Sequence, residues 1–155
     1  MNTLRRSFLQ LILQTTAAAA AVAAGLGKVT QAVAATWNKS GFESKAVAEV
    51  MKSLGATGAV DNAGIVITAP DIAENGAVVP IEVVSRIPNT QSISVIAEKN
   101  PFPLAATADF ANGAEPYAYV RIKMGQTSNV RAVVKADGKF FTAVKEVKIT
   151  IGGCG

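Results

Sequence analysis

The 155-residue sequence contains no histidine and only one cysteine, Cys154. Serine and cysteine nucleophiles in enzymes are normally activated by a neighbouring base, most often histidine, so the usual nucleophilic constellations are excluded. Zinc, copper, haem and iron–sulfur centres rely largely on histidine and cysteine ligands, which this chain barely supplies. The composition therefore predicts no bound cofactor and gives little support for a catalytic protein, and the single cysteine excludes a disulfide within the chain.

Much of the net positive charge comes from the N-terminal segment. The formal net charge of +4 falls to about +1 once Arg5, Arg6 and Lys28 are set aside. The remaining Lys and Arg residues form no basic run, so we expect no nucleic-acid binding, which requires a clustered basic face. A strongly apolar run of roughly 20 residues, as a membrane span requires, is also missing, and we expect no membrane anchor.

The N-terminal residues have the pattern of an export signal. Arg5 and Arg6 lie in a Thr-Leu-Arg-Arg-Ser-Phe-Leu-Gln stretch that resembles a twin-arginine signal, which is a receptor-read address. An alanine-rich stretch and a small-residue cleavage site at 32–34 follow. We expect residues 1–34 to be a twin-arginine signal peptide and the mature protein to be exported; an uncleaved amphipathic anchor is the alternative. This pathway exports folded proteins, commonly because they carry a cofactor or a bound partner. Because this chain is poor in cofactor ligands, we expect it to be exported together with a partner subunit.

One amphipathic helix is predicted near the start of the mature chain. Ser44 is expected to cap its N-terminus, and Gly55 is expected to end it. Its apolar residues recur at the spacing of one helical face, which predicts a helix that covers a sheet. This apolar stripe consists of Val47, Val50, Met51 and Leu54.

From residue 65 onward, apolar and polar residues alternate with a period of two, which indicates strands with one buried face. Short strands without a strand–helix–strand rhythm predict an all-β fold: an immunoglobulin-like antiparallel β-sandwich over residues 35–151, with one short N-terminal helix. The expected buried faces are Ile65 and Ile67; Val79, Ile81 and Val83; Ile93, Val95 and Ala97; Val120, Ile122 and Met124; Val130, Ala132 and Val134; and Val147, Ile149 and Ile151.

Turns and irregularities are also predicted within this pattern. Proline cannot donate to a strand ladder, so Pro80 inside a strand predicts an edge position or a bulge. The alternation changes phase between Val144 and Val147, which predicts a bulge near Lys145 and Glu146. The turn signals are Asn75-Gly76, Asn112-Gly113 and, as a tight hairpin, Asp137-Gly138.

Two polar segments are candidates for a site but favour a structural interpretation. Asp71 and Glu74 could form a carboxylate pair, but their place in a turn-rich loop predicts caps and solvated charges instead of a catalytic or metal site. Residues 123–127 (Lys-Met-Gly-Gln-Thr) are predicted to form a polar turn between two strands, at the border of a partner surface.

The cysteine lies on a glycine-only tail, with Gly152 and Gly153 before it and Gly155 after it. Glycine leaves the sulfur unshielded and allows nearly every backbone conformation. Residues 152–155 are therefore predicted to form a flexible carrier arm, on which Cys154 lies roughly 10 Å beyond Ile151 when extended. The alternative is an incidental cysteine at a frayed end.

Four segments together resemble the SoxY family, the sulfur-carrier subunits of the bacterial thiosulfate-oxidising Sox system. The chain stops one glycine short of the Gly-Gly-Cys-Gly-Gly ending that is common in that family. The segments are Ala-Pro-Asp-Ile-Ala-Glu-Asn-Gly-Ala-Val-Val-Pro at 69–80, Glu-Lys-Asn-Pro at 98–101, Arg-Ile-Lys-Met-Gly at 121–125 and Gly-Gly-Cys-Gly at 152–155.

The resemblance implies a periplasmic, immunoglobulin-like carrier that pairs with a second β-sandwich subunit, SoxZ. It implies that thiosulfate-derived sulfur is attached covalently to Cys154 by a haem enzyme. A manganese-dependent hydrolase then releases sulfate, and a sulfane dehydrogenase oxidises the remaining sulfur. The carrier itself would catalyse none of these steps.

Two other functions remain open. The chain could be an exported structural β-sandwich module that uses its single cysteine for an interchain disulfide, or a thiol enzyme in its own right. A carrier and a structural module both predict a reactive thiol, but only a carrier predicts sulfur adducts on Cys154 that depend on thiosulfate.

Overall fold

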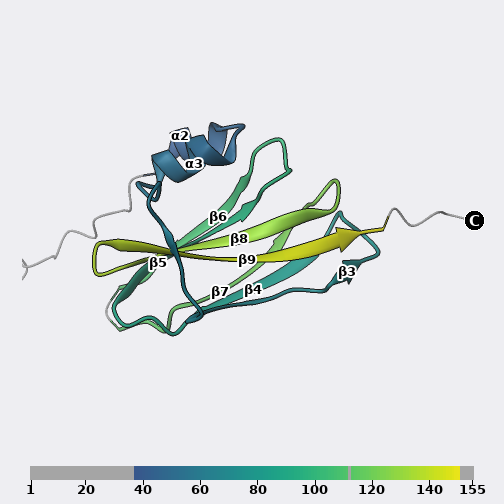
Figure 1. Ribbon diagram of the computed structural model, residues 1–155. Helices are drawn as coiled ribbons and strands as arrows, with labels where there is room; N and C mark the ends of the chain where they lie inside the picture. The colour runs from purple at the N-terminus through teal and green to yellow at the C-terminus, as the bar shows by residue number, and fades with distance from the viewer. Residues whose placement is uncertain (1–36, 112, 151–155) are drawn as a thin grey trace, which may run out of the picture. The chain divides into compact units, whose positions relative to one another are not determined.

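The computed structural model describes residues 37–111 and 113–150 (Figure 1). These residues form two short helices followed by nine strands. The helices are α2 (Lys39–Glu43) and α3 (Val47–Ser53). The strands are β1 (Val60–Asp61), β2 (Ile65–Thr68), β3 (Ile72–Ala73), β4 (Val79–Ser85), β5 (Thr90–Ala97), β6 (Leu104–Asp109), β7 (Tyr117–Ile122), β8 (Ser128–Ala136) and β9 (Lys139–Ile149).

The strands form two sheets. The larger has the order β1-β9-β8-β5-β6, with β3 also paired to β9, and the smaller has the order β2-β4-β7. Alternate residues of both sheets point into a shared core, as an immunoglobulin-like sandwich requires. The fold class predicted from the alternation is therefore confirmed.

Most pairings are antiparallel, but two at one edge are parallel and were not predicted. Strand β1 pairs with Phe141 and Thr142 of β9, and β3 pairs with Lys148 and Ile149 of the same strand. Between them the chain crosses to the smaller sheet as β2. Strand β6 also escaped the sequence analysis, because its Leu-Ala-Ala-Thr-Ala-Asp sequence has no clear alternation of apolar and polar residues.

The predicted inward faces are largely confirmed. Val79, Ile81 and Val83 of β4 are fully buried, and Met124 is buried although β7 ends at Ile122. Ile151 lies outside the described residues. The other predicted positions with at most 8% exposure are Ile65, Ile93, Val95, Ala97, Ile122, Val130, Ala132, Val134 and Val147.

A second apolar cluster lies on the outer face of the larger sheet, where the helices cover it. Val50 of α3 packs with Ile96, Leu104 and Val133, all buried. These three belong to β5, β6 and β8 and point away from the sandwich core, and none of them was among the predicted buried residues. The predicted apolar stripe of the helix is confirmed, since its other members pack around the same cluster.

The C-terminal end of the predicted helix is correct, but its N-terminal cap is wrong. Ser44 does not cap α3; it follows the separate helix α2, and its hydroxyl donates to the Ser40 carbonyl at 2.7 Å. Helix α3 instead starts after Ala46, without a side-chain cap. Gly55 ends it as predicted: its φ is 75°, and its N–H donates to the Lys52 carbonyl at 3.0 Å.

One predicted irregularity is wrong. Strands β8 and β9 keep one register from Ser128–Val147 to Ala136–Lys139, so there is no bulge near Lys145 and Glu146. The phase change arises because Val144 belongs to the outer face, where it is 43% exposed. The register shifts of the larger sheet lie in β5 instead, between Thr90 and Ser92 and between Val95 and Ile96.

Pro80 lies in β4, which is the central strand of its sheet and keeps a regular register there. It pairs with Arg121 of β7 but lies beyond Glu82, the last residue that β2 reaches. The predicted edge position is therefore confirmed locally, because the side of β4 that faces β2 is unpaired at Pro80.

The Asp137-Gly138 hairpin is confirmed, with φ values of 47° and 72° at its two turn residues. Gly113 has a φ of 75°, whereas Asn112 lies outside the described residues. Within the part of the chain that the structure describes, no helix has the length and apolar character to span a membrane.

Candidate functional site at the root of the carrier arm

Every residue of the predicted arm, Gly152, Gly153, Cys154 and Gly155, lies outside the described residues. So do Arg5, Arg6 and the rest of the predicted signal peptide. The structure does describe the point from which the arm extends. Strand β9 ends at Ile149, and Thr150 is the last described residue, so the surroundings of Thr150 form the arm root.

One side of the arm root is held by β3. Figure 1 shows this short strand beside the end of β9. The backbone N–H of Lys148 donates to the Asp71 carbonyl at 3.0 Å, and that of Thr150 donates to the Ala73 carbonyl at 3.1 Å. These two bonds extend the parallel pairing to the last described residue, so the backbone is held in place up to Thr150.

The other side of the arm root is held by the loop between β7 and β8. The Ile149 N–H donates to the Thr127 hydroxyl at 3.0 Å. Strand β8 begins only at Ser128, so a side chain takes the place of a strand partner here. The final residues of β9 are thus hydrogen-bonded on both edges, although β8 does not extend beyond the partner of Val147.

We call residues 71–78 the collar, because they follow the arm root from β3 into the turn before β4. Within it, the Asn75 side chain accepts a hydrogen bond from the Ala77 N–H at 2.8 Å. The Met124 N–H donates to the Gly76 carbonyl at 2.7 Å. A Cβ atom on Gly76 would overlap the Met124 carbonyl oxygen and lie 3.0 Å from Ile149 Cγ2, so only glycine fits at this contact.

The loop between β5 and β6 is attached to the same end of the sandwich. The Asn100 side-chain amide donates to the Lys123 carbonyl at 2.7 Å, and the Lys99 N–H donates to the Ser128 hydroxyl at 3.0 Å. Ser128 pairs with Val147 of β9, three residues before Thr150. Residues 98–101 are therefore connected to the arm root through the start of β8.

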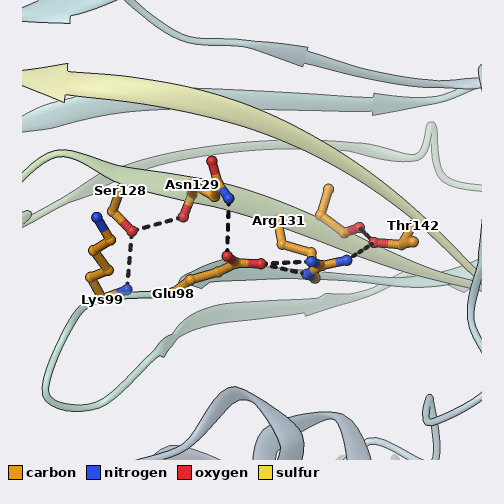
Figure 2. A network of polar contacts seen from close by, with 7 residues as sticks. Glu98, Lys99, Ser128, Asn129, Arg131 and Thr142 are labelled. Carbon is orange, nitrogen blue, oxygen red and sulfur yellow. Dashed lines mark hydrogen bonds and ion pairs between the residues drawn. The ribbon is translucent and has the colours of Figure 1, made fainter.

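A polar network on the outer face of the larger sheet continues from this loop (Figure 2). Arg131 donates to the Glu98 carboxylate from Nε at 2.8 Å and from Nη2 at 2.7 Å, and Asn129 donates to the same carboxylate at 3.2 Å. The Thr142 hydroxyl accepts from Arg131 at 3.4 Å and donates to the Ala132 carbonyl at 3.0 Å. The network links strands β8 and β9 to the end of β5.

The two candidate carboxylates do not form a pair. The Asp71 carboxylate lies 3.0 Å from the Lys145 ammonium and is 88% exposed, and Glu74 is also exposed. Among the described residues, no three carboxylate or cysteine side chains gather in a way that could hold a metal ion. A shallow hollow of about 460 Å³ lies between the collar, residues 123–125 and Ile149.

The structure thus brings together three segments that carried the family resemblance: 69–80, 98–101 and 121–125. The fourth, 152–155, begins two residues after Thr150 in the chain. The sequence analysis missed β3 and the role of Thr127, since a two-residue strand has no period and a single threonine has no signal. The Asn75-Gly76 turn was recognised, but its contact with Met124 was not.

These features define a class: a small β-sandwich that ends in a firmly held strand from which a cysteine-bearing tail extends. The model of the family "sulfur oxidation protein SoxY" matches residues 50–154. The chain belongs to the SoxY family, whose members are sulfur carrier proteins.

One solved structure agrees with this assignment, and a second shares the fold. The sulfur carrier protein SoxY from Chlorobium limicola f thiosulfatophilum is 34% identical, with a TM-score of 0.62 over 69% of this chain and 94% of that chain. A superoxide reductase (neelaredoxin) from Ignicoccus hospitalis is 21% identical, with a TM-score of 0.50 over 56% of this chain and 79% of that chain, and shows the fold alone. Among curated proteins, none matches.

Proposed function

We propose that this chain is a covalent carrier of sulfur intermediates in periplasmic thiosulfate oxidation, and that the intermediates are attached at Cys154. The observation that carries the proposal is the arm root: the backbone is hydrogen-bonded on both edges up to Ile149 and, on the β3 side, to Thr150. A firm base followed by a glycine-rich tail would let one sulfur atom visit several active sites while the body stays folded.

The loading step is an oxidation. The Cys154 thiolate and the sulfane sulfur of thiosulfate form a new S–S bond, which gives Cys–S–S–SO₃⁻. Two electrons leave and are accepted by the haem enzyme that catalyses the step. The carrier supplies the thiol and its reach and, with no histidine in the sequence, needs the enzyme to assist the reaction.

The later steps would act on the same arm. A manganese-dependent hydrolase adds water to the terminal sulfonate, which releases sulfate and leaves a persulfide on the cysteine. A sulfane dehydrogenase can then oxidise the remaining sulfur. Because the intermediates stay tethered, each enzyme meets them at a high effective concentration.

We also propose that the protein works as a complex with SoxZ and reaches the periplasm through the twin-arginine signal at Arg5 and Arg6. Export of the folded complex would explain why a chain poor in cofactor ligands uses that pathway. In this proposal the protein is a substrate of the Sox enzymes and has no catalytic activity of its own.

The test is the intact mass of the protein isolated from cells grown on thiosulfate. We expect sulfane and sulfonate adducts on the native protein, none on Cys154→Ser, and no growth of that variant on thiosulfate. The matched control is Ser40→Cys in the Cys154→Ser background, which moves the only thiol to an exposed position on α2. It should react with iodoacetamide but remain unloaded.

Two results would contradict the carrier proposal. One is loading of the relocated cysteine at the native rate, because the arm would then be irrelevant. The other is a Cys154-linked covalent dimer whose amount does not depend on the sulfur source. The latter would support the structural module with an interchain disulfide.

A further inference from the structure

We propose that the collar is the docking surface on which the enzymes that act on the arm recognise the carrier body. Its apolar contacts are Ile72 and Val78, and its charged contacts are Lys148 beside it and Lys123 on the adjacent loop. The inference rests on the proposed carrier function and adds the surface that each enzyme must touch.

The length of chain beyond the root limits where an enzyme can sit. Cys154 is four residues past Thr150, so its reach from the last hydrogen-bonded residue is roughly 13–14 Å. Active sites are concave, and part of that reach is used inside the enzyme. The rim of the active site must therefore come against the residues that surround Thr150, which are those of the collar and the 123–127 loop.

Two branched apolar side chains are exposed at this place. Ile72 is 58% exposed and pairs with Lys148, two residues before Thr150. Val78 is 55% exposed and directly precedes Val79, which pairs with Ile122 at the end of β7. Single exposed apolar residues are normal, but two on one eight-residue segment at the arm root give a partner two apolar side chains to bury.

The charges around the arm root favour an acidic partner surface. Lys123 and Lys148 are exposed, and neither forms an ion pair with another described residue. The Asp71 carboxylate is paired with Lys145, so Glu74 is the remaining exposed acid of the collar. We therefore expect each enzyme to present acidic residues and an apolar strip around the opening of its active site, which also speeds association.

The apolar contacts are tested with Ile72→Thr/Val78→Thr, which keeps both side chains branched at Cβ. The carrier complex is loaded with thiosulfate by the haem enzyme of the same Sox system. We expect KM for the carrier to rise about tenfold, with kcat within twofold of native, because docking weakens while the arm is unchanged. Alkylation of Cys154 by iodoacetamide should proceed at the native rate.

The matched control is Val60→Thr. Val60 is 64% exposed and lies on β1, which, like β3, is a two-residue strand that pairs parallel to β9. It pairs with Phe141, eight residues before Ile149, or about 26 Å along the strand, which is outside the reach of the arm. We expect native KM for this variant.

The charged contacts are tested by measuring how kcat/KM depends on salt concentration. Lys123→Gln/Lys148→Gln should lower kcat/KM at low salt and flatten its decline as salt is added. Lys139→Gln, at the far end of β9, should leave kcat/KM at low salt and its decline with added salt unchanged.

An unchanged KM in the collar variant, or an equal rise in Val60→Thr, would overturn the docking surface while leaving the carrier function intact. Size-exclusion chromatography supplies another decisive result. If the collar variant loses SoxZ or a second copy of this chain, the surface holds a structural subunit and the proposal is wrong. Failure of the carrier function itself would appear separately, as loading that survives Cys154→Ser.

Discussion

Gly76→Ala should be a strongly destabilising substitution for so small a change. The added Cβ would overlap the carbonyl oxygen of Met124 and lie 3.0 Å from Cγ2 of Ile149. Both neighbours are constrained, because Met124 is 1% exposed and Ile149 is hydrogen-bonded through Thr127. Backbone must therefore move, and the 2.7 Å bond from the Met124 N–H to the Gly76 carbonyl is lost or stretched.

Two contributions set the expected magnitude. Overpacking of this kind typically costs about 1–3 kcal/mol. Leaving a buried backbone N–H without its partner costs about 1–3 kcal/mol more. Because part of the strain is relieved when the bond breaks, we expect the free energy of unfolding to fall by about 2–4 kcal/mol, with a decrease in Tm of roughly 10 °C.

The assay is urea denaturation of the mature protein, with hydrogen exchange to locate the effect. The Met124 and Thr150 amides should exchange faster in the variant than in the native protein. Gly125→Ala is the control, because a Cβ on Gly125 would have no heavy atom within 4 Å. It should be neutral, or stabilising by up to about 1 kcal/mol. Equal stability of the two variants would refute the close approach of collar and loop.

Two further predictions concern side chains away from the arm. Arg131→Met should destabilise by about 1–3 kcal/mol in urea denaturation, because Glu98 is only 20% exposed and would lose its charged partner, keeping only the Asn129 amide. Lys39→Met, which breaks an exposed pair on α2, should change stability by at most about 0.5 kcal/mol. The Tyr117 pKa should lie above 10.0, because desolvation and the Glu82 carboxylate oppose the phenolate. In an NMR pH titration of its ring signals, Glu82→Gln should lower that pKa, and no change would contradict this cause.

The strands of the sandwich could be predicted from the sequence where one face of a strand is buried and the other is solvated. Val79, Ile81 and Val83 follow that rule and are fully buried. The rule failed where both faces are covered, as at Ile96 beneath the helices, and where an apolar residue is exposed, as at Val144. A period-two pattern reports on exposure, so it cannot assign a residue whose outer face is covered by another element.

The local order of residues determined the alternating strands, the Asp137-Gly138 hairpin, the helix end at Gly55 and the glycine tail that carries Cys154. These features depend on neighbours in the chain, and their physical causes are contained within a few residues. Only the tertiary structure decided that the collar and Thr127 hold the end of β9, and that residues 98–101 join them. Such contacts join segments up to about 80 residues apart, and a two-residue strand or a single hydroxyl has no pattern of its own from which they could be predicted.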